Sequence, residues 1–207
     1  MRTLVLASQK GGVGKTTIAG HLAVMAEICG AGPVALIDTD PQGSLSSWWN
    51  ERQAETPAFA SVEIASLADH LKQLEKVGVK LAVIDTPPAV TETIRKVLAV
   101  ADLVLIPTRP SPHDLRAVGS TVELVEAAGK RMIFVINGAA QRAKITGEAA
   151  IALSQHGTVA PVTLYQRTDF AASMIDGRSV QEIDPTSRSS GEITELWNYV
   201  SMQLRKN

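Results

Sequence analysis

The chain has 207 residues, which is enough for one large domain. Hydrophobic residues make up 45% and charged residues 20%, which excludes a disordered or fibrous protein, and a formal net charge of −1 argues against a protein that coats nucleic acid by bulk charge. The single cysteine, Cys29, excludes an internal disulfide and a cysteine-rich zinc or iron–sulfur site within one chain.

The predicted strands are short, continuous apolar runs with helical patterns between them. Strands are expected at about 4–7, 34–37, 81–84, 103–106 and 132–136, and helices at about 15–29, 66–77, 91–100, 113–128, 145–156 and 190–205. Strands that are apolar throughout are typical of a sheet buried on both faces. This order predicts an α/β fold: a single domain over residues 1–207, with a mostly parallel twisted sheet flanked by helices on both faces. The least regular segment is about 41–62 and the next is about 157–190, and both are candidates for mobile or partner-facing segments.

A glycine-rich loop joins the first strand to the first helix. Its sequence from residue 9 to residue 17 is Gln-Lys-Gly-Gly-Val-Gly-Lys-Thr-Thr, which departs from the usual phosphate-loop spacing. The glycines let the backbone turn tightly and aim its N–H groups at phosphate oxygens, and the N-terminus of the helix adds partial positive charge. We expect Lys15 to reach the β- and γ-phosphates, Thr16 to place its hydroxyl on Mg²⁺, and Thr17 to bond the α-phosphate. The predicted nucleotide-binding residues of the loop are Lys10, Gly11, Gly12, Val13, Gly14, Lys15, Thr16 and Thr17.

Lys10 is a second lysine at the start of this loop, and one subunit does not need it to hold phosphate. With Lys10 in this place, the sequence resembles the deviant Walker A ATPases of the ParA/MinD family of P-loop NTPases. In that family the early lysine reaches across a nucleotide-sandwich dimer to the partner's phosphates. The resemblance therefore implies that Lys10 stabilises charge in trans, as an arginine finger does. The alternative is an ordinary solvated lysine near a phosphate.

Aspartates close two of the predicted strands. Asp38 and Asp40 follow the run at 34–37, and Asp85 follows the run at 81–84. Because ligands bind at the carboxyl ends of strands in an open parallel sheet, these carboxylates should converge on the glycine-rich loop. We expect Asp85 to hold Mg²⁺ through water, with Asp38 close to the metal. Asp40 should orient the attacking water, as the resemblance also implies, although any one Asp at a strand end is often only a turn former.

Two further residues near strand ends are candidates for the nucleotide pocket. Asn137 ends the run at 132–136, and in the family an Asn at this position recognises adenine, because its amide both donates and accepts. The alternative for Asn137 is a turn former. Pro110 lies in a proline-rich segment that resembles the one leading into the family's dimer-facing helix. Pro110 either shapes the pocket or the dimer face, or belongs to a plain loop.

Charge is unevenly divided along the chain. Residues 1–128 hold 11 basic and 14 acidic residues, whereas residues 129–207 hold 9 basic and 7 acidic residues. ParA proteins bind DNA non-specifically as ATP dimers, and a weakly basic C-terminal part is compatible with a phosphate-facing surface that forms only in the dimer. Solvated surface charge is an equal alternative for each candidate taken alone. The candidate DNA contacts are Arg142, Lys144, Arg167, Arg178 and Arg188.

The resemblance covers essentially the whole chain and is closest to the short ParA-type partition ATPases, without an N-terminal helix-turn-helix extension. It implies an ATPase that needs ATP and Mg²⁺, forms a homodimer with ATP and binds DNA non-specifically. Hydrolysis would be stimulated by a ParB-like or other adaptor, and the cargo would be a plasmid, a chromosome region or a protein assembly.

The expected location is the cytoplasm, on the nucleoid. No apolar run reaches the ~18 residues that a membrane span needs, and the N-terminus leads directly into a strand-like run rather than a signal peptide. The tail lacks the basic amphipathic membrane helix of MinD, so no membrane partner is expected. The alternatives are a MinD-like membrane-associated positioning ATPase and a P-loop amidase or synthetase of metabolism.

Overall fold

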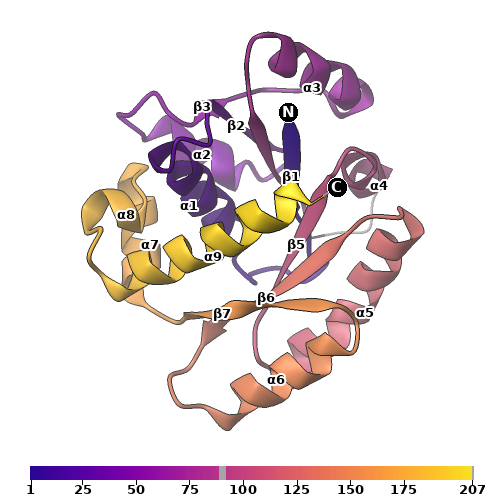
Figure 1. Cartoon of the computed structure of the whole chain (residues 1–207), viewed down its shortest axis with the longest axis vertical. Coiled ribbons are helices and arrows are strands. Elements are labelled where there is room, and N and C mark those ends of the chain that lie inside the picture. The colour runs from indigo at the N-terminus through magenta and orange to yellow at the C-terminus, as the bar shows by residue number, and fades with distance from the viewer. Residues whose placement is uncertain (89–91, 207) are drawn as a thin grey trace.

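The computed structural model describes residues 1–88 and 92–206, and within these ranges a seven-stranded sheet organises the fold (Figure 1). All neighbouring strands run parallel, in the spatial order β3-β2-β4-β1-β5-β6-β7. The prediction of a mostly parallel α/β sheet is confirmed. The strands are β1 (Arg2–Leu6), β2 (Val34–Asp38), β3 (Ala58–Phe59), β4 (Leu81–Asp85), β5 (Leu103–Thr108), β6 (Met132–Ala139) and β7 (Thr158–Tyr165).

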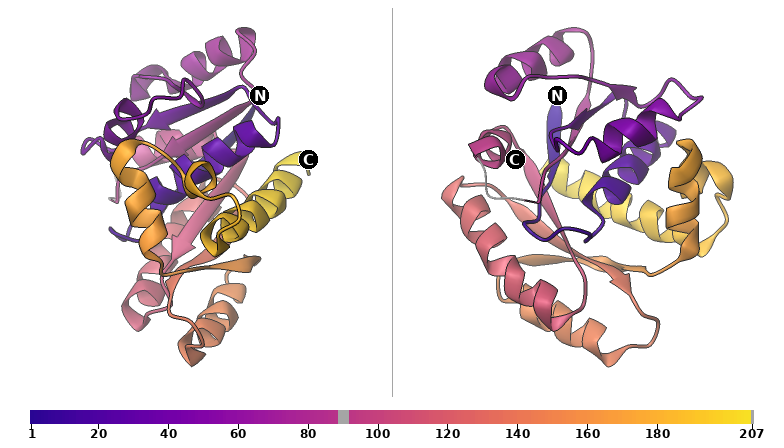
Figure 2. Two further views of the ribbon diagram at one scale, coloured as in Figure 1. Left: turned by 90° about the vertical axis from the view of Figure 1, so that its left-hand side faces the viewer. Right: turned by 180° about the vertical axis from the view of Figure 1, so that it is seen from behind.

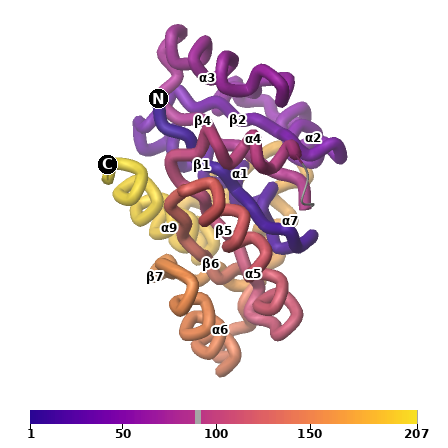
Figure 3. Tube along the Cα trace, turned by 90° about the vertical axis from the view of Figure 1, so that its right-hand side faces the viewer, coloured from indigo at the N-terminus to yellow at the C-terminus, as the bar shows by residue number. Residues whose placement is uncertain are grey.

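Helices cover both faces of this sheet, as predicted. One core cluster joins α1, α2 and α9 to one face, and a second joins α3, α4, α5 and α6 to the other. Figure 2 shows α9 beside α1, and Figure 3 shows α4 and α5 from the opposite side. The helices are α1 (Lys15–Ile28), α2 (Ser44–Asn50), α3 (Leu67–Lys76), α4 (Glu92–Ala99), α5 (Pro112–Ala127), α6 (Lys144–Ser154), α7 (Thr168–Ser173), α8 (Val180–Ile183) and α9 (Arg188–Arg205), with 3₁₀ turns at Ile64–Ser66 and Met174–Asp176.

The apolar strand runs arise from this three-layer arrangement. Along β1, Leu4 and Leu6 join the first cluster, whereas Val5 and Ala7 join the second, and all four are fully buried. Since successive side chains of a strand point to opposite faces, a central strand covered on both sides must be apolar at every position.

Two segments without a sequence pattern contain regular structure, so the prediction of irregularity is wrong. Residues 41–62 hold α2 and β3, and residues 157–190 hold β7, α7 and α8. β7 is an edge strand whose residues alternate between exposed and buried, with Pro161 at an exposed position, so it lacks an apolar run. α2 is too short to show a helical period. Residue 91, the first of the helix predicted at 91–100, lies outside the described residues.

His21 is a buried polar residue that joins α1 to α7. Its Nδ1 lies 2.7 Å from the Thr17 carbonyl oxygen and its Nε2 lies 3.1 Å from Oγ of Ser173. The imidazole also packs edge-on against the Phe170 ring, with ring centroids 5.4 Å apart. Burial lowers the pKa of His21 to about 4, because the charged imidazolium would lose its hydration, and the bond to Thr17 only partly opposes this.

The stabilising contribution of His21 should therefore be lost in mild acid, while Asp85, whose pKa is raised, contributes with the opposite sign. The folded-state pKa of His21 lies below its ordinary value of 6.5, so its contribution is complete above pH 6.5 and is lost as the pH falls toward 4. Between pH 7 and pH 5 we expect this group to remove about 2 kcal/mol from the free energy of unfolding. Urea unfolding of His21→Gln at both pH values should show a drop smaller by that amount. An equal drop in both proteins would contradict the prediction.

Candidate functional site

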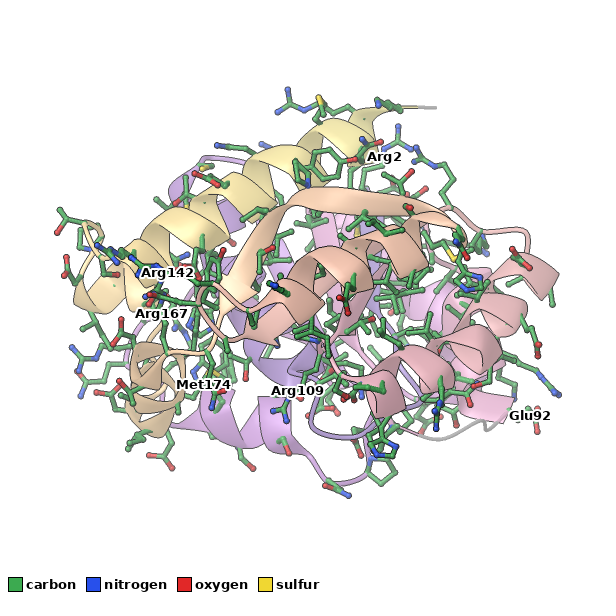
Figure 4. The ribbon with its side chains drawn as sticks, turned by 90° about the horizontal axis from the view of Figure 1, so that it is seen from below. Arg2, Glu92, Arg109, Arg142, Arg167 and Met174 are labelled. Atoms are coloured by element: carbon green, nitrogen blue, oxygen red, sulfur yellow. The ribbon has the colours of Figure 1, made fainter. Side chains whose placement is uncertain are left out.

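Many of the predicted site residues line a cleft of about 920 Å³ at the carboxyl ends of the strands, whereas Lys10, Val13, Asp38, Asp85 and Pro110 are not in its lining. The glycine-rich loop, Asp40 and the ends of β6 and β7 line it. Figure 4 shows three other lining residues, Arg109, Arg167 and Met174, from below. The loop residues in the lining are Gly11, Gly12, Gly14, Lys15, Thr16 and Thr17.

The loop turns through two glycines that adopt left-handed backbone angles. Gly12 has φ +74° and Gly14 has φ +93°, which a residue with a side chain rarely adopts. A Cβ at Gly14 would also stand 2.3 Å from Nδ2 of Asn137. Gly14 caps α1, so the helix starts directly at Lys15 and its free N–H groups face the cleft. This is the geometry that binds phosphate at helix N-termini.

The two lysines of the loop differ in environment. Lys15 is buried, and burial lowers its pKa although Asp85 and Asp40 favour its charged form. Lys10 is exposed. A buried ammonium group among carboxylates is suited to neutralise bound phosphate within this subunit, whereas an exposed one is available to another molecule.

Thr16 lines the cleft, and Asp85 is buried beside it. The Thr16 hydroxyl donates to Oδ2 of Asp85 at 2.5 Å. Burial raises the pKa of Asp85 to about 7, against the bond from Thr16 and the charge of Lys15, which lower it. The β2–β4 register sets Asp38 directly opposite Asp85, and the Asp38 charge raises this pKa further.

Asp38 has a second task in the structure, which is to shape the loop between β2 and α2. Its Oδ2 accepts from the backbone N–H groups of Leu45 and Ser46, each at 3.0 Å, and its Oδ1 accepts from that of Asp40 at 3.0 Å. These bonds anchor the start of α2 and aim Asp40 into the cleft. The metal role of Asp38 stays a prediction.

The residues present fit Mg²⁺, the ion that the fold family implies. Thr16, Asp38 and Asp85 offer hydroxyl and carboxylate oxygens, which are the donors Mg²⁺ prefers, and the ion typically takes few protein ligands beside waters and phosphate. In residues 1–88 and 92–206, no group of three or more His, Cys, Asp or Glu side chains stands close enough to hold a metal.

Asn137 lies at the other end of the loop, on β6. Its Nδ2 donates to the Val13 carbonyl oxygen at 2.7 Å. Because a carbonyl only accepts, this bond fixes the amide orientation, and one Nδ2 hydrogen and Oδ1 stay able to bond a ligand. The structure therefore brings Asn137 to the phosphate loop, while its role toward a base stays a prediction.

Several lining residues are not predicted to face the nucleotide. Arg109, rather than Pro110, lines the cleft after β5. Tyr165 at the end of β7 and the following Gln166 and Arg167 also line it, and Arg167 is predicted as a DNA contact instead. The strand-end argument would find Arg109, but the three others lie at or after the end of a strand that the apolar pattern does not show.

The predicted DNA contacts do not share one environment. Arg167 is half-buried and pairs with Glu192 through its Nε at 3.0 Å and its Nη2 at 2.5 Å, and Arg178 pairs with Asp176 at 2.7 Å. Arg142, Lys144 and Arg188 are exposed, and no ion pair involves them in the described part of the chain. Figure 4 places Arg142 on the same side of the molecule as Arg167.

A parallel sheet with a glycine-rich loop, a buried lysine and strand-end carboxylates defines a phosphate-loop nucleotide-binding protein. The chain belongs to the CbiA family, the CobQ/CobB/MinD/ParA nucleotide binding domain, which matches residues 4–180. It is a ParA/MinD-type member of a family of nucleotide-hydrolysing ATPases that includes positioning proteins.

Similar proteins span nearly the whole chain. Maintenance of carboxysome distribution protein A of Halothiobacillus neapolitanus is 32% identical over 215 residues, covering 96% of this chain and 95% of that protein. Protein ParA of Rhizobium radiobacter is 29% identical over 184 residues, covering 83% and 82%. An ATP complex of a Cyanothece McdA variant has the same fold, with a TM-score of 0.81 at 20% identity over 100% of this chain and 97% of that one. No helix in the described residues combines the length and the apolar character needed to cross a membrane.

Nucleotide binding should depend on Lys15. We expect Lys15→Ala to weaken ATP binding by roughly 2–5 kcal/mol, because bound phosphate would lose its buried counter-charge. Isothermal titration calorimetry with ATP and Mg²⁺ measures this, with Lys144→Ala as the control, since Lys144 is exposed and does not line the cleft. If the ATP affinity of Lys15→Ala is unchanged, the assignment of Lys15 to the phosphate site is wrong.

Proposed function

We propose that the chain is a Mg²⁺-dependent ATPase switch, which forms a homodimer with ATP, binds DNA non-specifically in that state and positions a cargo. The observation that carries the proposal is the pair of lysines in one loop, with Lys15 buried beside Asp85 and Lys10 exposed. One subunit has no evident use for a second, outward-facing cation at its phosphate loop. A second copy facing the cleft would use it.

We further propose that Asn137 contacts the adenine base. With one Nδ2 hydrogen donated to Val13, Oδ1 can still accept from the exocyclic amino group of adenine, and the second Nδ2 hydrogen can still donate to a ring nitrogen. The ends of β6 and β7, including Leu164 and Tyr165, supply the rest of the lining. This arrangement is compatible with ATP, the nucleotide that the family resemblance implies.

We propose that Asp40 orients the water that attacks the γ-phosphate. Its backbone N–H is held by Asp38 and its Oδ1 accepts from the Gln42 N–H at 3.0 Å, so the carboxylate is fixed where it lines the cleft. Lys15 and Lys10, the latter from the partner, would offset the charge that spreads over the phosphoryl oxygens. Mg²⁺, held by Thr16 and Asp85 with Asp38 nearby, would supply further charge neutralisation.

The cargo and the partners follow from the names of the relatives. One relative distributes carboxysomes and another is a ParA protein, so we propose a protein assembly, a plasmid or a chromosome region as the cargo. An adaptor on that cargo would stimulate hydrolysis and release the dimer from DNA. We further propose that the protein works in the cytoplasm, on the nucleoid.

Asp40→Ala should separate the ATP-bound state from turnover. We expect the Asp40→Ala variant to bind ATP and dimerise, while hydrolysis falls at least tenfold because no side chain orients the attacking water. Light scattering after gel filtration with ATP measures the dimer, and phosphate release measures turnover. Dimerisation lost together with ATP binding would contradict this role, and rapid hydrolysis would move the water role to Asp38.

Non-specific DNA binding should depend on the unpaired cations near α6. We expect Arg142→Glu with Lys144→Glu to weaken binding of the ATP-bound protein to DNA and to lower the salt slope by about 1 for each DNA phosphate that the variant no longer neutralises. The matched control is Lys76→Glu, which changes an exposed charge on α3. If all variants bind DNA equally well, the DNA contacts lie on other residues.

ATP-dependent flotation with liposomes would favour the membrane-associated alternative. Turnover stimulated by a small carboxylic substrate would favour the metabolic alternative.

A further inference from the structure

The start of the phosphate loop is held by a helix from the far part of the chain. The backbone N–H of Gln9 donates to Oγ1 of Thr121 at 3.1 Å. Thr121 lies in α5 with 1% of its surface exposed, and Gln9 directly precedes Lys10. The bond therefore joins the residue beside the exposed lysine to the centre of a buried helix face.

This anchor acts where the sheet no longer holds the chain. The Ala7 N–H donates to the Leu105 carbonyl at 3.1 Å, and the bond from Gln9 to Thr121 follows two residues later. The Lys10 N–H reaches only back to Oγ of Ser8, at 3.3 Å. The backbone N–H of Gln9 makes the contact to Thr121, and Nε2 of its side chain is buried without a hydrogen-bond partner in the described residues.

α5 holds Thr121 in a fixed position, because the helix is capped and packed into the core. Ser111 caps the helix by accepting from the Asp114 N–H at 3.1 Å, and Pro112 occupies its first turn. Val118 and Val122, on either side of Thr121, are buried in the second core cluster. A change in the position of α5 is therefore passed to the backbone at Gln9.

We propose that Thr121 is a positioning residue for Lys10, which it acts on through the Gln9 backbone. The inference rests on the proposed role of Lys10 in hydrolysis. The effect of a lysine that contacts a phosphate across a dimer interface depends on where its ammonium group lies. A displacement of about 1 Å can lower the rate by up to about 100-fold. Without the Thr121 hydroxyl, the Gln9 N–H would lose its acceptor and the loop would leave β1 in a less defined direction.

The test is steady-state ATP hydrolysis by the full chain. Thr121→Val keeps the side-chain shape and removes the acceptor, and we expect kcat to fall about tenfold while KM for ATP changes less than about twofold. Thr121→Ser restores the hydroxyl and should restore kcat. The control is Thr146→Val, which removes a hydroxyl on α6 that is buried without a partner in the described residues and should leave kcat unchanged.

The Lys10→Ala background separates positioning from general damage. If Thr121 acts through Lys10, Thr121→Val should have no further effect on kcat once Lys10 is replaced. An undiminished tenfold loss in that background, a kcat of wild-type size for Thr121→Val, or a failure of Thr121→Ser to restore kcat would overturn the inference. Should Lys10→Ala alone leave kcat unchanged, the proposed role of Lys10 would fail first, and the inference with it.

Discussion

The burial of opposite charges at the end of a parallel sheet is the constraint on which the site depends. β2 and β4 end level, so Asp38 and Asp85 stand opposite one another, and Lys15 begins the helix above them. Burial disfavours both charges, raising the pKa of Asp85 and lowering that of Lys15. Each charge favours the other, since Lys15 lowers the pKa of Asp85 and Asp85 raises the pKa of Lys15. The loop, the register and the helix start are the means by which the fold keeps them together.

Hydrogen bonds to other parts of the chain hold these charged groups and the elements around them in place. Thr16 donates to Asp85, and Asp38 gives its oxygens to backbone groups at the start of α2, which keeps that helix over the cleft. α1 in turn is joined to α7 by His21, and the first turn of the loop is joined to α5 by Thr121. Residues outside the cleft, on α5 and α7, thereby fix the positions of the loop and of α1, which carry the charged side chains of the site.

The sequence patterns predict the central part of the fold because that part repeats one physical situation. Strands buried on both faces are continuous apolar runs, and polar residues follow several of these runs at the ligand edge, so Asp38, Asp85 and Asn137 can be found from position alone. β7 is not predicted because half of it faces solvent, so neither Tyr165 nor Arg167 is assigned to the cleft, although Arg167 is predicted as a DNA contact. Two contacts could not be predicted either. Glu192 lies 25 residues from its partner Arg167, and Thr121 lies 112 residues from its partner Gln9, so no local sequence pattern indicates either contact.

The bond between Asn137 and Val13 has an energetic consequence for the cleft. It makes the residue proposed to contact the base and the loop proposed to bind the phosphates parts of one hydrogen-bonded unit, packed so closely that a methyl group at Gly14 would not fit. Base and triphosphate bound to such a unit are coupled, and the coupling is reciprocal: whatever factor the triphosphate imposes on base affinity, the base imposes on triphosphate affinity. Where that coupling is favourable, discrimination between bases is greatest for the nucleotide that carries the full phosphate chain.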